Sequence, residues 1–183
     1  MSNAELPRSV DPHRLTENGA ELEGDVPLVK LSRFRGAVLA VPDGGLCRVH
    51  LVFSTDSERR RVVRGELEAS VELECQRCMT GMLSPLRSSF ELGLVPSDEQ
   101  ARQLPTELEP FVIDGDRVDL WTLVEDELLL ALPAFPVHER GDCPATSELE
   151  ALEPGSGDEQ AASDSDEQRD NPFKVLEGLK TKH

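Results

Sequence analysis

One stretch of alternating apolar and acidic residues constrains the fold of this chain more than any other feature. It runs from Val62 to Cys75. The two-residue period of an extended strand places its apolar side chains on one side and its glutamates on the other. The apolar set is Leu67, Ala69, Val71, Leu73 and Cys75, and the acidic set is Glu66, Glu68, Glu72 and Glu74. This pattern is typical of an antiparallel sheet with one buried face and one face in water.

Three further segments are expected to be neighbours of this strand. Residues 47–53 alternate well, and residues 83–95 resemble a returning strand, which leaves Cys75-Gln76-Arg77-Cys78 in the turn between strands. Residues 34–41 are apolar and end at Pro42-Asp43-Gly44-Gly45, a strong turn signal, so they also suit a strand. We therefore expect an α+β fold: an antiparallel, partly barrel-like sheet with one main helix packed on it.

The main helix is predicted over residues 120–132, after Asp119 as N-cap and before Pro133. At about 100° per residue, Glu127 falls within the apolar stripe of this helix, whereas Glu125 and Asp126 fall outside it. The stripe itself consists of Leu120, Leu123, Val124, Leu128 and Ala131. A carboxylate that faces the core needs a partner. Arg77 is our candidate for it, and the alternative is that Glu127 reaches water at the edge of the stripe.

Composition divides the rest of the chain. Residues 1–27 are polar and punctuated by proline and glycine, which indicates an irregular N-terminal arm before a folded core at 28–143. Residues 142–170 hold ten Asp or Glu and one Arg, a net charge of −9, and we expect 144–170 to be disordered. Asn171 and Pro172 can start a helix, so residues 171–183 are expected to form a short C-terminal helical motif.

The cysteines suggest a metal site. With no export signal, they are expected to be reduced thiols or metal ligands rather than disulfides. Cys75 and Cys78 form a Cys-x-x-Cys pair, and His138 and Cys143 follow about 60 residues later. These are the residue types of a closed tetrahedral zinc site, so one structural zinc ion could join two parts of the core. The alternative is a set of reduced thiols in a packed loop.

A second cluster contains arginines: Arg59, Arg60 and Arg61, followed by Arg64. Guanidinium groups match phosphate oxygens bidentately, so this strip, together with Arg77 in the cysteine turn, is a candidate contact for RNA or a partner. The alternative is that the strip balances the glutamates of the exposed sheet face, as cross-strand pairs commonly do.

The charge of the chain points to basic partners. The net charge is −17, and residues 1–141 carry −10 of it. Such a surface repels phosphates and attracts cations. There is no Tyr and a single Trp, so a stacking platform for single-stranded nucleic acid is not expected.

Neither catalysis nor a membrane span is expected. The sequence has no phosphate-binding glycine loop and no nucleophile elbow, and the adjacent residues Glu125, Asp126 and Glu127 point in different directions on a helix. No run of residues is long and apolar enough to span a membrane, and no secretory signal pattern opens the sequence. A cytoplasmic location is therefore expected.

Several segments together resemble the bacterial YceD family. They are residues 73–78, the pairs Leu104-Pro105 and Glu109-Pro110, residues 124–133 continuing to Pro136-Val137-His138 and Cys143, and residues 171–180. The resemblance spans nearly the whole chain and implies a factor associated with the synthesis, processing or stability of large-subunit (23S) ribosomal RNA, not a known enzyme. It also marks positions that are candidates for a shared site: Cys75, Arg77, Cys78, Glu125, Glu127, Pro133, His138 and Cys143.

We therefore expect a non-catalytic ribosome-biogenesis factor, and two routes of action stay open. In one, the arginine strip and Arg77 contact RNA directly. In the other, the acidic chain acts as a chaperone or adaptor that holds a basic ribosomal protein or RNA-processing enzyme, and composition favours this route. A third interpretation, a metal-dependent hydrolase, requires an open coordination position on the metal.

Overall fold

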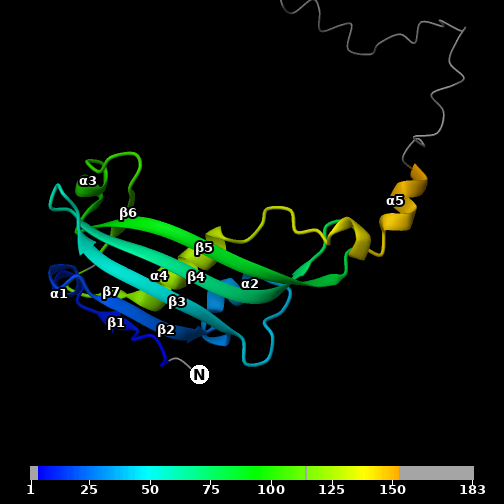
Figure 1. The fold of residues 1–183 in the computed structure, drawn as a ribbon, viewed down its shortest axis with the longest axis horizontal. Helices are drawn as coiled ribbons and strands as arrows, with labels where there is room; N and C mark the ends of the chain where they lie inside the picture. Colours follow the sequence, from blue (N-terminus) through cyan, green and yellow to red (C-terminus); the bar gives the residue numbers. More distant parts are fainter. Residues whose placement is uncertain (1–3, 114, 153–183) are drawn as a thin grey trace, which may run out of the picture. The chain divides into compact units, whose positions relative to one another are not determined.

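The computed structural model describes residues 4–113 and 115–152 of the chain (Figure 1). The chain divides into two compact units, residues 1–146 and 147–183. In the second unit the described residues belong to helix α5 (Thr146–Leu152), at the start of the segment expected to be disordered. The predictions for residues 153–170 and 171–183 lie outside the described residues.

The first unit is built on a five-stranded sheet in the order β2-β3-β4-β5-β6. The strands are β2 (Glu21–Pro27), β3 (Leu46–Thr55), β4 (Arg61–Glu74), β5 (Gly81–Val95) and β6 (Glu109–Val112). Neighbours from β2 to β5 run antiparallel, and β6 runs parallel to β5. A smaller sheet pairs β1 (Ser9–Val10) with β7 (Val118–Asp119). The α+β class is confirmed, but the expected barrel-like closure is not: within the described residues the large sheet is open at β2 and β6.

The alternating pattern on β4 defines the buried face. Leu67, Val71 and Cys75 are buried on one side, while Glu66 and Glu68 are exposed on the other. Strand β3 continues the buried face, with Val49 opposite Leu67 in register and Phe53 opposite Val63. The predicted strands at 47–53, 62–75 and 83–95 are all present.

The expectation of an irregular arm over residues 1–27 is wrong for its described part. It contains β1, helix α1 (Pro12–Glu17) capped by Asp11, and β2. Residues 4–6 run alongside β2, where the N–H of Leu6 bonds the carbonyl oxygen of Asp25 at 3.0 Å. A Cβ at Gly24 would lie 2.9 Å from the backbone of Ala4 and Leu6. The glycine that suggested irregularity is therefore required for two backbones to approach closely.

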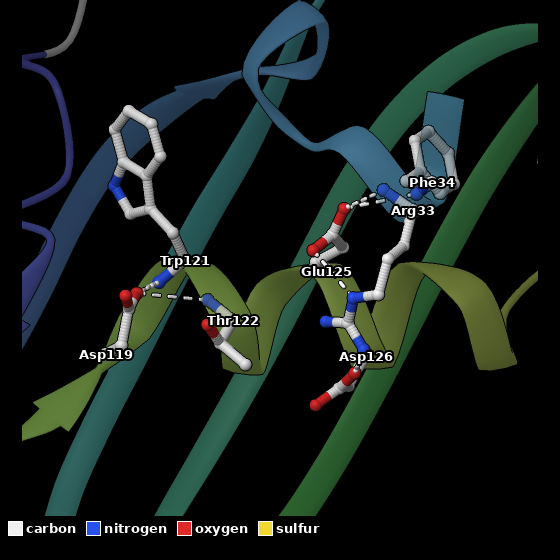
Figure 2. A network of polar contacts seen from close by, with 7 residues as sticks. All are labelled: Arg33, Phe34, Asp119, Trp121, Thr122, Glu125 and Asp126. Carbon is white, nitrogen blue, oxygen red and sulfur yellow. Dashed lines mark hydrogen bonds and ion pairs between the residues drawn. The ribbon is translucent and has the colours of Figure 1, made fainter. Parts of the chain in front are cut away.

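Residues 34–41 do not form the predicted strand. They overlap helix α2 (Ser32–Ala37), which follows a 3₁₀ turn at Leu28–Lys30 and completely buries the side chain of Phe34. The main helix, α4 (Leu120–Leu130), begins after Asp119, whose carboxylate accepts bonds from the N–H groups of Trp121 and Thr122, as predicted (Figure 2). Both α2 and α4 contribute to the same apolar core as the buried face of the sheet.

Two further helical segments are short: α3 (Asp98–Ala101) lies between β5 and β6, and a 3₁₀ turn is formed by Arg140–Asp142. Among the described residues, every helix is too short or too polar to cross a bilayer.

Candidate metal centre

The turn between β4 and β5 presents two thiols on one side. The N–H of Met79 bonds the carbonyl oxygen of Cys75 at 2.8 Å, and the N–H of Cys75 bonds the carbonyl oxygen of Thr80 at 2.9 Å. Met79 has a positive φ of 57°, which closes the turn tightly. The result is a knuckle, residues 75–80, that holds Cys75 and Cys78 at the end of the sheet.

The segment after α4 brings the second half of the cluster to this knuckle. It leaves the helix at Ala131 and passes Pro133, which is exposed. The carbonyl oxygen of Pro136 then accepts a hydrogen bond from the N–H of Gln76 at 2.9 Å, and that of His138 accepts one from Arg77. These backbone contacts align the segment so that His138 reaches the knuckle.

Four potential metal ligands converge here. The Sγ atoms of Cys75, Cys78 and Cys143 and one ring nitrogen of His138 all lie within 4.8 Å of one another. His138 Nδ1 is 3.4 Å from Cys78 Sγ. In a tetrahedral site with metal–sulfur bonds of about 2.3 Å, ligand atoms are separated by about 3.8 Å. Cys75 and Cys143 are buried and the other two are half-buried, so this cluster could hold a metal ion.

The knuckle also stabilises the ionised form of a ligand. Burial opposes ionisation of Cys75, but the N–H groups of Cys78, His138 and Arg77 point at its sulfur and lower its pKa to about 5. The hydrogen bond with Thr80 is the main cause of a lowered pKa at Cys78. A thiolate is the form that binds a metal ion. By contrast, burial raises the pKa of Cys47, a buried residue outside the cluster, to about 12.

The structure does not contain the expected pair of Arg77 and Glu127. Arg77 turns toward the carbonyl oxygen of His138, and its Nε is buried with no partner among the described residues. Of the two alternatives for Glu127, the structure has the inward-facing one, since the residue is only 7% exposed. Its pKa is raised by burial first, and then by the charges of Glu109 and Asp126.

The carboxylate that does hold α4 is Glu125 (Figure 2). Its Oε1 accepts bonds from the backbone N–H of Arg33 at 2.7 Å and of Phe34 at 3.1 Å, and its Oε2 lies 3.0 Å from Arg33 Nε. Asp126 adds a second, more exposed contact to Arg33 at 2.7 Å. Two buried or half-buried N–H groups at the start of α2 are thus satisfied by a residue some 90 positions away.

The contact between Arg33 and Glu125 could not be predicted from the sequence, because α2 has no local signal that marks its first residue. Its N-cap is Leu31, which makes no side-chain cap bond. Glu125 supplies the missing cap from another helix, and caps of this kind leave no local motif.

The arginine strip lies far from the cysteine cluster. Arg61 begins β4 and Glu74 ends it, which separates the two sites by roughly 40 Å of extended strand. Arg60 pairs with Asp56 at 2.6 Å and Glu58 at 3.0 Å, and Arg64 pairs with Glu91 at 2.7 Å. The strip and Arg77 therefore belong to separate parts of the surface.

Comparisons with known proteins agree with the resemblance seen in the motifs. The family model described as "Large ribosomal RNA subunit accumulation protein YceD" matches residues 63–180. The chain belongs to the YceD family. A protein of Haemophilus influenzae named "Large ribosomal RNA subunit accumulation protein YceD" is 32% identical over 183 residues, which is 100% of both chains. No solved structure matches the chain.

The residues that match the YceD family model include both halves of the cysteine cluster. The matched range 63–180 contains the knuckle, helix α4 and the segment that carries His138 and Cys143. Arg33 and residues 59–61 precede this range. The Haemophilus protein aligns with those residues as well, because its similarity extends over the whole chain.

Proposed function

We propose that this chain is a non-catalytic, cytoplasmic factor of ribosome biogenesis that supports accumulation of large-subunit ribosomal RNA. The observation that carries the proposal is the end-to-end similarity to the Haemophilus protein of that name. The similarity is not limited to one module, so it includes both the core and the acidic segment after it.

The proposal predicts that this chain can replace a related protein in cells. In a bacterial strain that lacks its own YceD-family gene, expression of this chain is expected to restore the ratio of large-subunit to small-subunit ribosomal RNA. Gel electrophoresis of total RNA measures this ratio, with the empty vector as control. A ratio that stays at the empty-vector level, while the folded protein accumulates, would contradict the proposal.

A structural zinc ion is part of the proposal. Three cysteines and one histidine fit the preference of zinc for sulfur and nitrogen, and they supply all four ligands of a tetrahedral site. When bound, the ion would tie the end of β4 to the segment that follows α4. Because protein ligands fill every tetrahedral position, the set does not suit a metal-dependent hydrolase, which needs a position for water.

Charge on the exposed face of the sheet favours a basic protein as the partner. Residues that are direct partners on neighbouring strands share a face, so the strand registers identify the residues of this face. Carboxylates outnumber basic side chains there. The acidic residues are Glu21, Glu23, Asp25, Glu66, Glu68, Glu72, Glu74 and Glu91, and the basic ones are Arg48, Arg64, Arg87 and His50. Several of the arginines are already paired, as in Arg48 with Glu68 at 3.1 Å. This face repels an RNA backbone and suits a cationic partner.

Direct RNA contact is the second candidate function, and it rests on Arg59 and Arg61. Neither makes an ion pair in the part of the chain that the structure describes. Arg59 occupies the turn between β3 and β4 with a positive φ of 62°. Together with Arg60, both residues line a groove whose other wall is formed by residues 94–104.

The two candidates make different predictions for these arginines. If a basic protein is the partner, the double change Arg59→Ala and Arg61→Ala should alter affinity for a large-subunit RNA fragment by less than about threefold. Fluorescence anisotropy at several salt concentrations measures it, with exposed Arg14→Ala on helix α1 as the matched control. A loss of tenfold or more, together with a shallower salt dependence that Arg14→Ala does not show, would instead establish the RNA route.

A further inference from the structure

Strand β5 is an open edge of the sheet over much of its length. It pairs with β4 from Gly81 to Gly93, but its other neighbour, β6, pairs only with Leu92–Val95. Residues 83–89 therefore have a strand on one side and none on the other among the described residues. We call this stretch the β5 edge.

Hydrogen bonds elsewhere show which backbone groups point outward. On β4, the N–H of Glu72 bonds the carbonyl oxygen of Ala40, so the backbone of Glu72 faces away from β5 and from its partner Leu83. On β5, the carbonyl oxygen of Val95 accepts from the N–H of Ile113, on the β6 side. Alternation along the strand then directs the backbone of Leu83, Pro85, Arg87 and Ser89 outward. These groups have no hydrogen-bond partner within residues 4–113 and 115–152.

Within the described residues, Pro85 protects the β5 edge by removing one outward donor, and the exposed Arg87 adds a charge. Natural proteins usually shield a longer open edge, because free N–H and C=O groups can pair with another chain. Pro85 also shows that the strand tolerates proline at an outward-facing position, as edge strands do.

Two carboxylates without a cation flank one end of the edge. Glu127 on α4 is 7% exposed, and Ser88 of β5 is a polar neighbour that partly offsets the rise in its pKa. Glu109 is the first residue of β6 and lies opposite Leu92 of β5. Its negative charge helps to raise the pKa of Glu127. Neither makes an ion pair with any residue in the described part of the chain. A nearly buried carboxylate beside another negative charge is costly unless a cation joins it.

The other end of the edge is apolar with an acidic rim. Residues 81–85 and 137–142 line the two walls of an open groove. Leu83 is 68% exposed and Val137 is 42% exposed, and the exposed carboxylates of Glu139 and Asp142 lie on the second wall. The whole edge thus combines free backbone groups, apolar contacts and negative charge.

We propose that the β5 edge binds an extended segment of a partner protein as an added strand, with lysine or arginine side chains placed against Glu127 and Glu109. A segment of seven residues spans roughly 20 Å, the length of the edge. Main-chain bonds supply affinity in this mode of recognition and side chains supply selectivity. RNA fits this edge poorly, because it has no peptide N–H and C=O groups to pair with β5 and because its phosphates are repelled by the carboxylates. The inference names a partner class for the proposed function and rests on it for that role.

Synthetic peptides test this surface in the full-length protein. The probe is a ten-residue peptide that alternates valine with lysine or arginine, and the comparison is the same peptide with glutamate as its charged residue. Binding of the basic peptide is expected to slow hydrogen exchange at the N–H groups of Leu83, Arg87 and Ser89. Ser89→Pro removes one of these donors and should weaken binding about tenfold, whereas Ser89→Ala keeps the donor and should change it less than twofold.

A second pair of variants tests the charge. Glu127→Gln keeps the shape of the side chain but removes the negative charge, and should weaken binding of the basic peptide about fivefold. Glu66→Gln, the same change at an exposed site on the opposite face, should have little effect. Equal binding by Ser89→Pro and Ser89→Ala, no binding at millimolar concentration, or protection confined to other strands would overturn the proposal. So would binding of a ten-nucleotide RNA at the edge in place of the peptide.

The peptide-binding experiment and the cellular test can refute the proposed surface and the proposed function separately. If the chain restores ribosomal RNA in the deletion strain but binds no basic peptide, the surface is refuted and the function stands. If the peptide binds as expected but Ser89→Pro restores ribosomal RNA fully, the surface is real and its role in that function is refuted.

Discussion

Replacing Cys75 with serine is expected to remove bound zinc and to lower the melting temperature of the protein by about 10 °C or more. Cys75 is completely buried, and backbone N–H groups from both halves of the cluster point at its sulfur. A serine hydroxyl is a poor zinc ligand, so the variant should lose the metal. Without the metal, the knuckle and the segment after α4 would no longer be held together. Elemental analysis and differential scanning calorimetry measure the two effects.

The matched control is Cys47→Ala, a change at a buried cysteine outside the cluster. It should keep one zinc per chain, because Cys47 lies on β3 and is not among the converging ligands. Purified wild-type protein that contains no zinc, and that melts at the same temperature as Cys75→Ser, would contradict the prediction.

The direction of the pH dependence follows from the same contacts. The pKa of Cys75 is lowered from 9.0 to about 5 in the folded chain, since the N–H bonds outweigh burial. The folded chain therefore favours the thiolate, and this contribution to stability is fully present above pH 9 and declines to nothing as the pH falls to about 5. Protons should accordingly compete with the metal in the acidic range.

Patterns that depend on burial could be predicted from the sequence. The alternation of β4 predicted its buried face and placed Cys75 on it. Side chains alternate with a period of two residues, so an apolar set on one face leaves a single orientation of the strand toward the core. The pairing of Cys75 and Cys78 with His138 and Cys143 could be predicted because zinc ligands come in a small set of residue types and spacings. Helix α4 had a local cap at Asp119 and a proline after it.

Features that depend on a distant partner could not be predicted. Glu125 lies outside the apolar stripe of α4 yet is buried, because the start of α2 covers it. Helix α2 in turn has no cap of its own, so its apolar residues looked like a strand. The open part of β5 depends on where β6 begins, and neither strand encodes that boundary in its own residues.

Helix α4 is thus attached at two points of different chemistry. The cysteine cluster fixes the segment that follows the helix, and Glu125 fixes its middle to α2. The contact at Glu125 needs no metal, so the helix should remain docked when zinc is removed even though the knuckle loosens. The two attachments can be separated by mutation.

Glu125→Ala is expected to lower the free energy of unfolding by about 3–4 kcal/mol. The change removes the acceptor for the N–H groups of Arg33 and Phe34 and leaves these donors without a partner at a site where the wild-type side chain is only 10% exposed. It also removes the ion pair with the Arg33 side chain. Chemical denaturation measures the loss, which is a large share of the 5–15 kcal/mol typical of a domain.

The neighbouring change Asp126→Ala is the matched control, because Asp126 contacts the same arginine from an exposed position. It should cost less than about 1 kcal/mol, as exposed ion pairs do. Arg33→Ala should also cost less than Glu125→Ala, since the backbone N–H of residue 33 still reaches the carboxylate. Equal losses for all three variants would mean that the side-chain ion pair, and not the capping of α2, holds the two helices together. A larger loss for Glu125→Ala identifies the cap as the dominant contact, and zinc content should then stay at the wild-type level in this variant.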